Sequence, residues 1–141
     1  MLKLVPLGGL GEIGLNAMLL EAQGERVLID CGLMFPHGDF PGVEVFVPDF
    51  TALTEGAAKL KAVVLTHAHE DHVGALPWLL KKQPVPIYGT RFTLALVRHR
   101  LDELSIRADL RVFEPRERVK LCPAFTVEPI PTLLSWSKRL P

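Results

Sequence analysis

Apolar and polar positions in the first third of the chain follow a pattern that predicts strands joined by turns. Residues 2–7 are apolar and compatible with a strand, and four glycines between positions 8 and 14 then interrupt the pattern. Two further runs, Asn16 to Glu21 and Arg26 to Asp30, flank a polar turn and therefore predict a hairpin. Residues 31–56 are rich in Gly, Pro and Asp, which predicts a long irregular segment of a kind that is usually functional or covers the fold.

The hydrophobic period changes in the second half of the chain. The continuous apolar run Ala62 to Leu65 predicts a strand buried on both faces. Val73 to Leu80 predicts a short helix despite the proline within it, Val85 to Tyr88 a strand, and Arg91 to Leu104 an amphipathic helix. Two or three short strands are expected between Leu110 and Ile130. Strands that alternate with helices indicate an α/β fold.

Length and charge limit the possible classes of protein. With 141 residues, 48% of them hydrophobic, the chain can bury the core of one modest domain. Its 16 basic and 16 acidic side chains cancel, which removes any general attraction to nucleic acid. The charges are unevenly placed, because residues 1–80 hold four Lys or Arg against ten Asp or Glu, whereas residues 81–120 hold ten against five. The acidic part suits a cation site, and the basic stretch from Lys81 to Lys120 could lie near a phosphate backbone or form an ordinary solvated surface of mixed charge.

Two cysteines and the N-terminal pattern argue against an extracellular or membrane protein. Cys31 and Cys122 are far apart in sequence, so we expect both to be small buried residues rather than a disulfide or a metal-binding pair. The N-terminus has no basic region followed by an unbroken apolar run, and no segment reaches membrane-spanning length. We therefore expect a cytoplasmic protein with no membrane partner.

The densest chemistry lies in the segment that follows the buried strand, where residues 66–72 contain three imidazoles and two carboxylates. Two histidines separated by one residue project to the same side of an extended chain, so His67 and His69 can bind one cation at about 2.0–2.1 Å. Asp71 and His72 follow where the chain turns into a helix and can diverge toward a second cation.

Two such cations, roughly 3.5–4 Å apart, would activate a water molecule and neutralise charge on a substrate, so hydrolysis is the natural reaction class. The alternative is a solvated polar loop that is merely rich in histidine. Two other histidines are poor ligand candidates. His37 lies in the long irregular segment, and His99 lies between two arginines on the polar face of a predicted helix, so solvent exposure explains both.

Beyond the single motif, several stretches resemble a known family. Thr66, the histidine segment and the following Val-Gly-Ala-Leu-Pro resemble the signature of the metallo-β-lactamase superfamily. A thioesterase or lactamase of this superfamily would share the histidine loop but not the glycine-rich opening together with the stretch Gly-Leu-Met-Phe-Pro. Within the superfamily, four further stretches resemble ribonuclease J, a β-CASP ribonuclease: residues 7–14, 30–36, 47–49 and 86–90.

The resemblance implies an αββα sandwich of which residues 1–130 form the N-terminal portion. It also implies two zinc ions in a complete site and an RNA substrate that is cleaved internally and from its 5′ end, and a homo-oligomer for the full-length family. On this interpretation His67 and His69 bind one zinc, and Asp71 and His72 bind the other. Asp30 would lie behind them and orient a ligand histidine through a hydrogen bond. An ordinary aspartate at the end of a strand would equally explain Asp30.

The family pattern also requires a third histidine, a bridging aspartate and another histidine further along, yet no histidine follows His99. We therefore expect residues 131–141 to be an aberrant tail from a truncated or frameshifted gene, an apolar face to remain exposed, and the chain to have little activity by itself. Two alternatives stay open: a hydrolase of the same fold that acts on a small ester or thioester, and a non-catalytic remnant.

Overall fold

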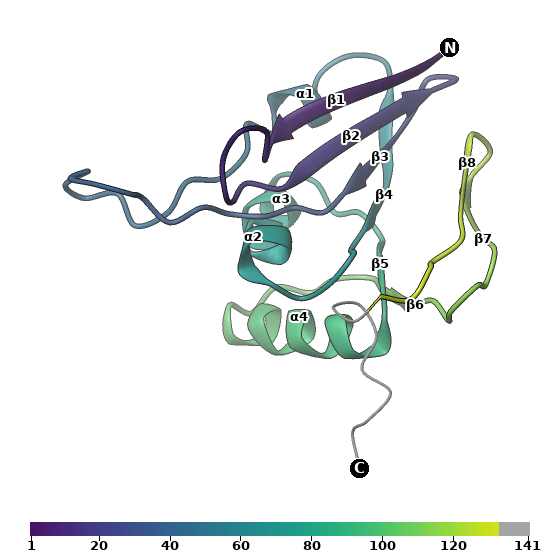
Figure 1. Ribbon diagram of the computed structural model, residues 1–141. Helices are drawn as coiled ribbons and strands as arrows, with labels where there is room; N and C mark the ends of the chain where they lie inside the picture. The colour runs from purple at the N-terminus through teal and green to yellow at the C-terminus, as the bar shows by residue number, and fades with distance from the viewer. Residues whose placement is uncertain (133–141) are drawn as a thin grey trace.

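Six strands form one mixed sheet, and helices pack against one of its faces (Figure 1). The computed structural model describes residues 1–132. The strand order follows the chain from β1 to β6. β2 pairs antiparallel with both of its neighbours, and the strands from β3 to β6 pair in parallel: β1 (Leu2–Gly8), β2 (Ala17–Ala22), β3 (Glu25–Ile29), β4 (Lys59–Val64), β5 (Ile87–Gly89) and β6 (Leu110–Val112). These strands confirm the predicted hairpin and the predicted buried strand.

The helices cover the face of the sheet that carries Leu28 and Val63, and the main core lies between them. The longest helix confirms the amphipathic pattern, and it begins after Thr90, whose hydroxyl accepts a hydrogen bond from the Thr93 N–H at 3.2 Å. The described helices are α1 (Thr51–Thr54), α2 (Glu70–Val73), α3 (Leu76–Lys82) and α4 (Arg91–Glu103).

The short helix predicted from Val73 to Leu80 is present as α3, but it begins later, at Leu76, and Val73 belongs to a separate short helix, α2. Pro77 lies in the first turn of α3, where its missing N–H removes no helical hydrogen bond, so it marks the start of a new helix. The helix before it, α2, begins at Glu70, inside the histidine motif.

The opposite face of the sheet is covered in part by a separate hairpin, β7 (Val119–Cys122) and β8 (Phe125–Val127), which completes the three short strands expected in this region. The hairpin packs against Val27, Ala62 and Val64 and forms a second, smaller core. It does not reach β1, where Leu2 and Leu4 are 57% and 63% exposed. Leu4 pairs with Leu20, which pairs with Val27, so these side chains lie on the same face as the second core.

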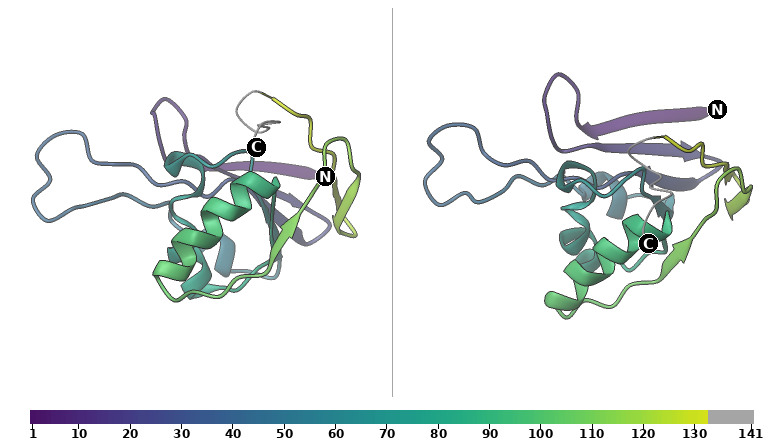
Figure 2. Two further views of the ribbon diagram at one scale, coloured as in Figure 1. Left: turned by 90° about the horizontal axis from the view of Figure 1, so that it is seen from below. Right: turned by 60° about the horizontal axis from the view of Figure 1, so that its bottom comes forward.

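The segment between β3 and β4 is irregular as predicted, apart from α1 and one bridge between Met34 and Phe46. Its middle part extends outward as a long arm (Figure 2), whereas Leu33, Phe50 and Leu53 near its two ends are buried in the main core. Cys31 and Cys122 are both buried and unbonded, as expected. Within residues 1–132, none of the helices combines the length and apolar character needed to span a membrane. Most of the tail predicted to be aberrant, residues 133–141, lies outside the described residues.

Candidate metal centre

The histidine motif lies at the carboxyl end of β4, beside the carboxyl end of the parallel strand β3. The chain leaves β4 in an extended conformation, which brings His67 to the edge of the sheet, where it is 8% exposed. His69 then precedes α2 as its N-cap residue, so Asp71 and His72 lie within the first turn of that helix. Because β3 and β4 are parallel and adjacent, the residue that follows β3, Asp30, comes to lie beneath the motif.

Asp30 is buried, and its carboxylate contacts three polar groups that belong to Thr66 and His72. It accepts hydrogen bonds from the Thr66 N–H and from the Thr66 hydroxyl, each at 2.8 Å. Its Oδ2 also lies 2.8 Å from His72 Nδ1. Asp30 adopts a left-handed backbone conformation with φ of 60°, which aspartate tolerates better than most residues. This geometry directs the second nitrogen of His72, Nε2, away from the protein core and toward Asp71.

The four motif residues form two close pairs of donor atoms. His67 Nε2 lies 3.2 Å from His69 Nδ1, and His72 Nε2 lies 3.4 Å from Asp71 Oδ2. Two ligand atoms about 2.0–2.1 Å from one tetrahedral zinc ion are separated by about 3.3–3.4 Å, so each pair is spaced like two ligands of a single cation. The pairs are neighbours, since the rings of His67 and His72 are 4.1 Å apart. In residues 1–132, however, no group of three or more His, Cys, Asp or Glu side chains is arranged to hold a metal ion.

The histidines differ in their electrostatic surroundings. Burial lowers the pKa of His67, and the neighbouring rings of His72 and His69 lower it further. Burial also lowers the pKa of His72, but the hydrogen bond to Asp30 and the charges of Asp30 and Asp71 outweigh this effect, so the pKa of His72 is raised overall. Of these two histidines, His67 is therefore the one favoured in its neutral form, which is the form that binds metal ions.

The sequence of this chain matches a known protein family. Residues 10–133 match the metallo-beta-lactamase superfamily. This chain belongs to that superfamily. Ribonuclease J from Synechocystis sp. is 46% identical over 130 residues, which are 90% of this chain and 20% of that protein. Ribonuclease J from Thermus thermophilus is 42% identical over 134 residues, which are 89% of this chain and 23% of that protein.

This chain therefore spans about a fifth of the length of these curated relatives, which are 20% and 23% covered. Among solved structures, the metallo-beta-lactamase fold protein YhfI from Bacillus subtilis matches with a TM-score of 0.56 and 19% identity. The match covers 90% of this chain and 51% of that chain. At this level of identity the match supports the metallo-beta-lactamase fold, which agrees with the fold class expected from the sequence.

Two residues that contact the motif could not be predicted from the sequence pattern, Asn16 and Gly32. Asn16 was interpreted only as the start of a strand, yet its side chain contacts Asp71. Gly32 is the first residue of the Gly-Leu-Met-Phe-Pro stretch, from which no contact was predicted, yet its backbone lies against that of Asp71. Neither residue can be protonated near neutral pH or is a preferred metal ligand, so no chemical signal marked them. The poor candidates His37 and His99 are both exposed and lie outside the cluster.

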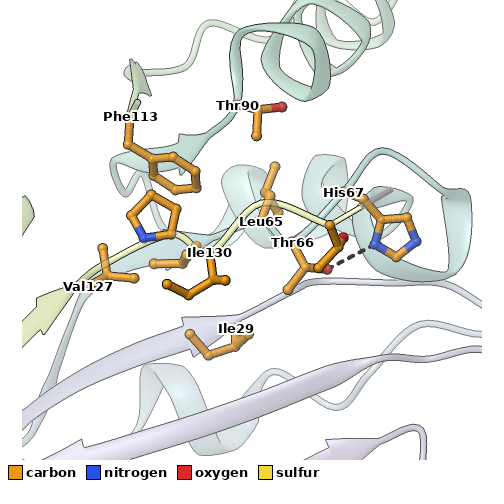
Figure 3. A pocket seen from close by; sticks show the side chains of 11 residues that line it. Ile29, Leu65, Thr66, His67, Thr90, Phe113, Val127 and Ile130 are labelled. Atoms are coloured by element: carbon orange, nitrogen blue, oxygen red, sulfur yellow. Dashed lines mark hydrogen bonds between the residues drawn. The ribbon is translucent and has the colours of Figure 1, made fainter. Parts of the chain in front are cut away.

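A pocket of about 320 Å³ lies beside the motif, between the sheet and the segment that follows β8 (Figure 3). Thr66 and His67 lie at one end of it, and the other end is lined mainly by apolar side chains that include Phe113, Val127 and Ile130. The histidine pair of this superfamily site is therefore bordered by a largely apolar space.

Part of the basic stretch forms a surface of mixed charge, which was one of the two interpretations of the sequence. Four of its arginines lie within 4 Å of a carboxylate, in the pairs Arg91–Glu114, Arg100–Glu103, Arg111–Asp109 and Arg118–Glu128. Arg98 and Arg107 form no such pair with any described residue, and both line a pocket of about 230 Å³ at the end of α4. Local contacts thus pair four of the ten basic side chains of this stretch.

Proposed function

We propose that this chain carries part of the metal centre of a metal-dependent hydrolase that cleaves RNA phosphodiester bonds, of the ribonuclease J type. The observation that supports this most strongly is the spacing of the two donor pairs, 3.2 Å and 3.4 Å, within a single turn. The similarity to proteins named ribonuclease J supports the substrate class. RNA as substrate, cleavage both internally and from the 5′ end, a cytoplasmic location and a homo-oligomeric complete protein all belong to this proposal.

The proposal assigns zinc to both positions, with His67 and His69 as ligands of one ion and Asp71 and His72 as ligands of the other. When bound, two such cations act as Lewis acids that activate water and neutralise the charge that develops on a phosphodiester. Asp30 orients His72 by accepting a hydrogen bond from Nδ1, which leaves Nε2 free to bind a cation.

Thr66 performs the same task for His67. Its hydroxyl carries one proton and donates it to Asp30, so the hydroxyl can only accept from His67 Nδ1, which lies 3.0 Å away. His67 Nδ1 therefore carries the proton, and Nε2 presents its lone pair toward His69. The chain from Asp30 through Thr66 to His67 sets the tautomer that a metal-binding histidine requires.

Each pair supplies two donors, whereas a zinc site has three or four protein ligands. We therefore propose that residues 1–130 correspond to the N-terminal portion of an αββα domain, and that this chain by itself binds metal weakly and has little activity. The complete protein would supply the remaining ligands.

Metal binding tests the proposal directly. Zinc bound per chain should be measured by mass spectrometry after equilibration with a defined zinc concentration, for the wild type, His67→Ala and His99→Ala. His99 is an exposed histidine on α4, so its substitution controls for the loss of an imidazole. We expect His67→Ala to lose the zinc that the wild type and His99→Ala bind. Equal zinc binding by all three proteins would contradict the assignment.

The substrate class needs a second test on the ligand-complete protein. A 5′-monophosphorylated RNA and a small thioester should be compared as substrates, because an RNA hydrolase and a small-ester hydrolase of the same fold would differ in this comparison. Turnover of the thioester without cleavage of RNA would overturn the proposed substrate.

A further inference from the structure

The glycine-rich connection between β1 and β2 ends beside the histidine motif, and the proposed function gives it no role. Its last residue, Asn16, donates two hydrogen bonds from its side-chain Nδ2, to the backbone carbonyl of Asp71 at 3.0 Å and to Asp71 Oδ2 at 3.1 Å. Asp71 Oδ2 is the same oxygen that lies 3.4 Å from His72 Nε2. The Asn16 amide therefore contacts the acidic member of the second donor pair.

The orientation of this amide is unambiguous. Both partners of Nδ2 are oxygen atoms that only accept hydrogen bonds, so the nitrogen end of the amide must face Asp71. The oxygen end faces Gly9, where an added Cβ would lie 2.8 Å from Asn16 Oδ1. Gly9 also has a φ of +81°, which disfavours any residue with a side chain. The glycine-rich connection thus leaves the space in which the Asn16 side chain lies.

The contact between Asn16 and Asp71 Oδ2 is not needed to hold the two segments together. The Asn16 N–H already donates to the Asp71 carbonyl at 3.0 Å, and the Gly32 N–H donates to the Asn16 carbonyl at 3.0 Å. These backbone bonds fix the position of the main chain whatever side chain residue 16 carries. The side-chain amide adds a restraint on one carboxylate oxygen, which the backbone bonds do not supply.

We infer that Asn16 is a positioning residue that holds the Asp71 carboxylate in place beside His72 for the second cation of the metal centre. This inference rests on the proposed function, because it concerns the same centre. Partners that orient a ligand in this way typically change metal affinity by roughly 10–100-fold when they are removed. The glycine-rich opening then acts by making room for Asn16 rather than by contacting a phosphate.

The test is a titration of the 141-residue chain with Co²⁺, which replaces zinc and reports on its ligands through visible absorption. Asn16→Asp retains the shape of the side chain but replaces the amide donor with a second carboxylate, and Asn16→Ala removes the side chain. We expect both variants to bind the second equivalent of Co²⁺ roughly 10–100-fold more weakly, with a changed absorption spectrum for that equivalent. The first equivalent, at His67 and His69, should be unaffected.

A control separates positioning from general stability. Thr54→Ala removes the hydrogen bond from the Thr54 hydroxyl to the backbone carbonyl of Phe50, the N-cap residue of α1. Thr54 takes no part in the metal centre. This variant should bind both equivalents like the wild type even if it unfolds more easily. Gly9→Ala retains Asn16 but crowds it, and should weaken the second equivalent in the same way as the Asn16 variants.

The outcomes distinguish this inference from the proposal on which it rests. If the wild-type chain binds two equivalents and Asn16→Asp binds both with unchanged affinity and spectrum, the inference is overturned and the metal centre stands. If the Asn16 variants lose both equivalents alike, Asn16 has only a structural role and the inference is again overturned. If the wild-type chain binds no Co²⁺ even with the metal in large excess, where weak binding would still be seen, the metal centre fails and the inference fails with it.

Discussion

The backbone of Gly32 lies directly against the backbone carbonyl of Asp71, so closely that a side chain on residue 32 would overlap the carbonyl oxygen. Two backbone hydrogen bonds flank this contact, from the Cys31 N–H to the His72 carbonyl at 2.7 Å and from the Leu33 N–H to the Glu70 carbonyl at 3.1 Å. The segment after β3 is thus joined to α2 main chain to main chain. This contact places Asp30, the residue before Cys31, beneath His72.

Gly32→Ala should therefore be strongly destabilising. The added methyl group meets backbone atoms that cannot rotate away, so we expect a loss of at least about 2 kcal/mol in the free energy of unfolding, measured with a denaturant. Gly89→Ala is the matched control, because the nearest atoms to its Cβ belong to side chains, those of Leu94 at 3.1 Å and Leu65 at 3.6 Å. Similar losses in the two variants would show that the contact with Asp71 is not the cause.

Asp30 should stabilise the fold mainly through the hydrogen bonds that it accepts and through its tolerance of a positive φ. Asp30→Ala removes hydrogen bonds to Thr66 and His72 and places alanine at a positive φ, so we expect it to cost about 3 kcal/mol of stability. Asp30→Asn retains an acceptor and tolerates this backbone conformation, so it should cost only about 1 kcal/mol. In both variants the pKa of His72 should fall, which an NMR titration measures. An unchanged His72 pKa would contradict the role assigned to Asp30.

Acid should weaken the attachment of the β7–β8 hairpin. Glu25 Oε2 accepts a hydrogen bond from the Ala124 N–H at 2.9 Å, and this bond, with smaller contributions from Cys122 and Lys61, lowers the pKa of Glu25. Since the folded pKa lies below the unfolded value, the carboxylate stabilises the fold above the ordinary glutamate pKa of about 4.3, and this stability is lost as the pH falls through the lower folded value.

The protection of the hairpin amides against hydrogen exchange, taken relative to the intrinsic rate at each pH, should therefore fall in this acidic range before the protection in β4 does. Glu25→Gln should lower hairpin protection at neutral pH and remove most of its dependence on pH. If protection in the variant keeps the pH profile of the wild type, another group is responsible for it.

The β7–β8 hairpin leaves part of one sheet face uncovered at β1, and this apolar surface should promote self-association. Leu4 is 63% exposed on the edge strand β1, and Leu2 beside it on the same face is 57% exposed. Leu4→Lys should shift the chain toward the monomer in sedimentation experiments and change stability by less than about 0.5 kcal/mol. Phe92→Lys adds the same charge to α4, where Phe92 is 41% exposed, and is the control. Equal effects of both substitutions would show that net charge, not this face, governs association.

Local patterns were sufficient to predict most elements, because they depend on neighbours in sequence. The apolar run around Val63 predicted β4, since a short continuous apolar run is typical of a strand buried on both faces. The helix around Pro77 was predicted, but its start was placed too early, because a proline in the first turn of a new helix has the same local signal as one inside a continuous helix. The four candidate ligands could also be selected locally, since they lie within six consecutive positions.

By itself, the sequence determined the strands, the longest helix, the superfamily and the candidate ligands proposed for a metal centre, because all of these depend on residues close together in the chain. Only the tertiary structure decided which atoms face one another. Asn16 reaches Asp71 across 55 positions, and Asp30 reaches His72 across 42. These contacts exist because β3 and β4 pair in parallel and end at the same edge of the sheet, where the antiparallel strand β2 begins, an arrangement set by long-range pairing that no local periodicity records.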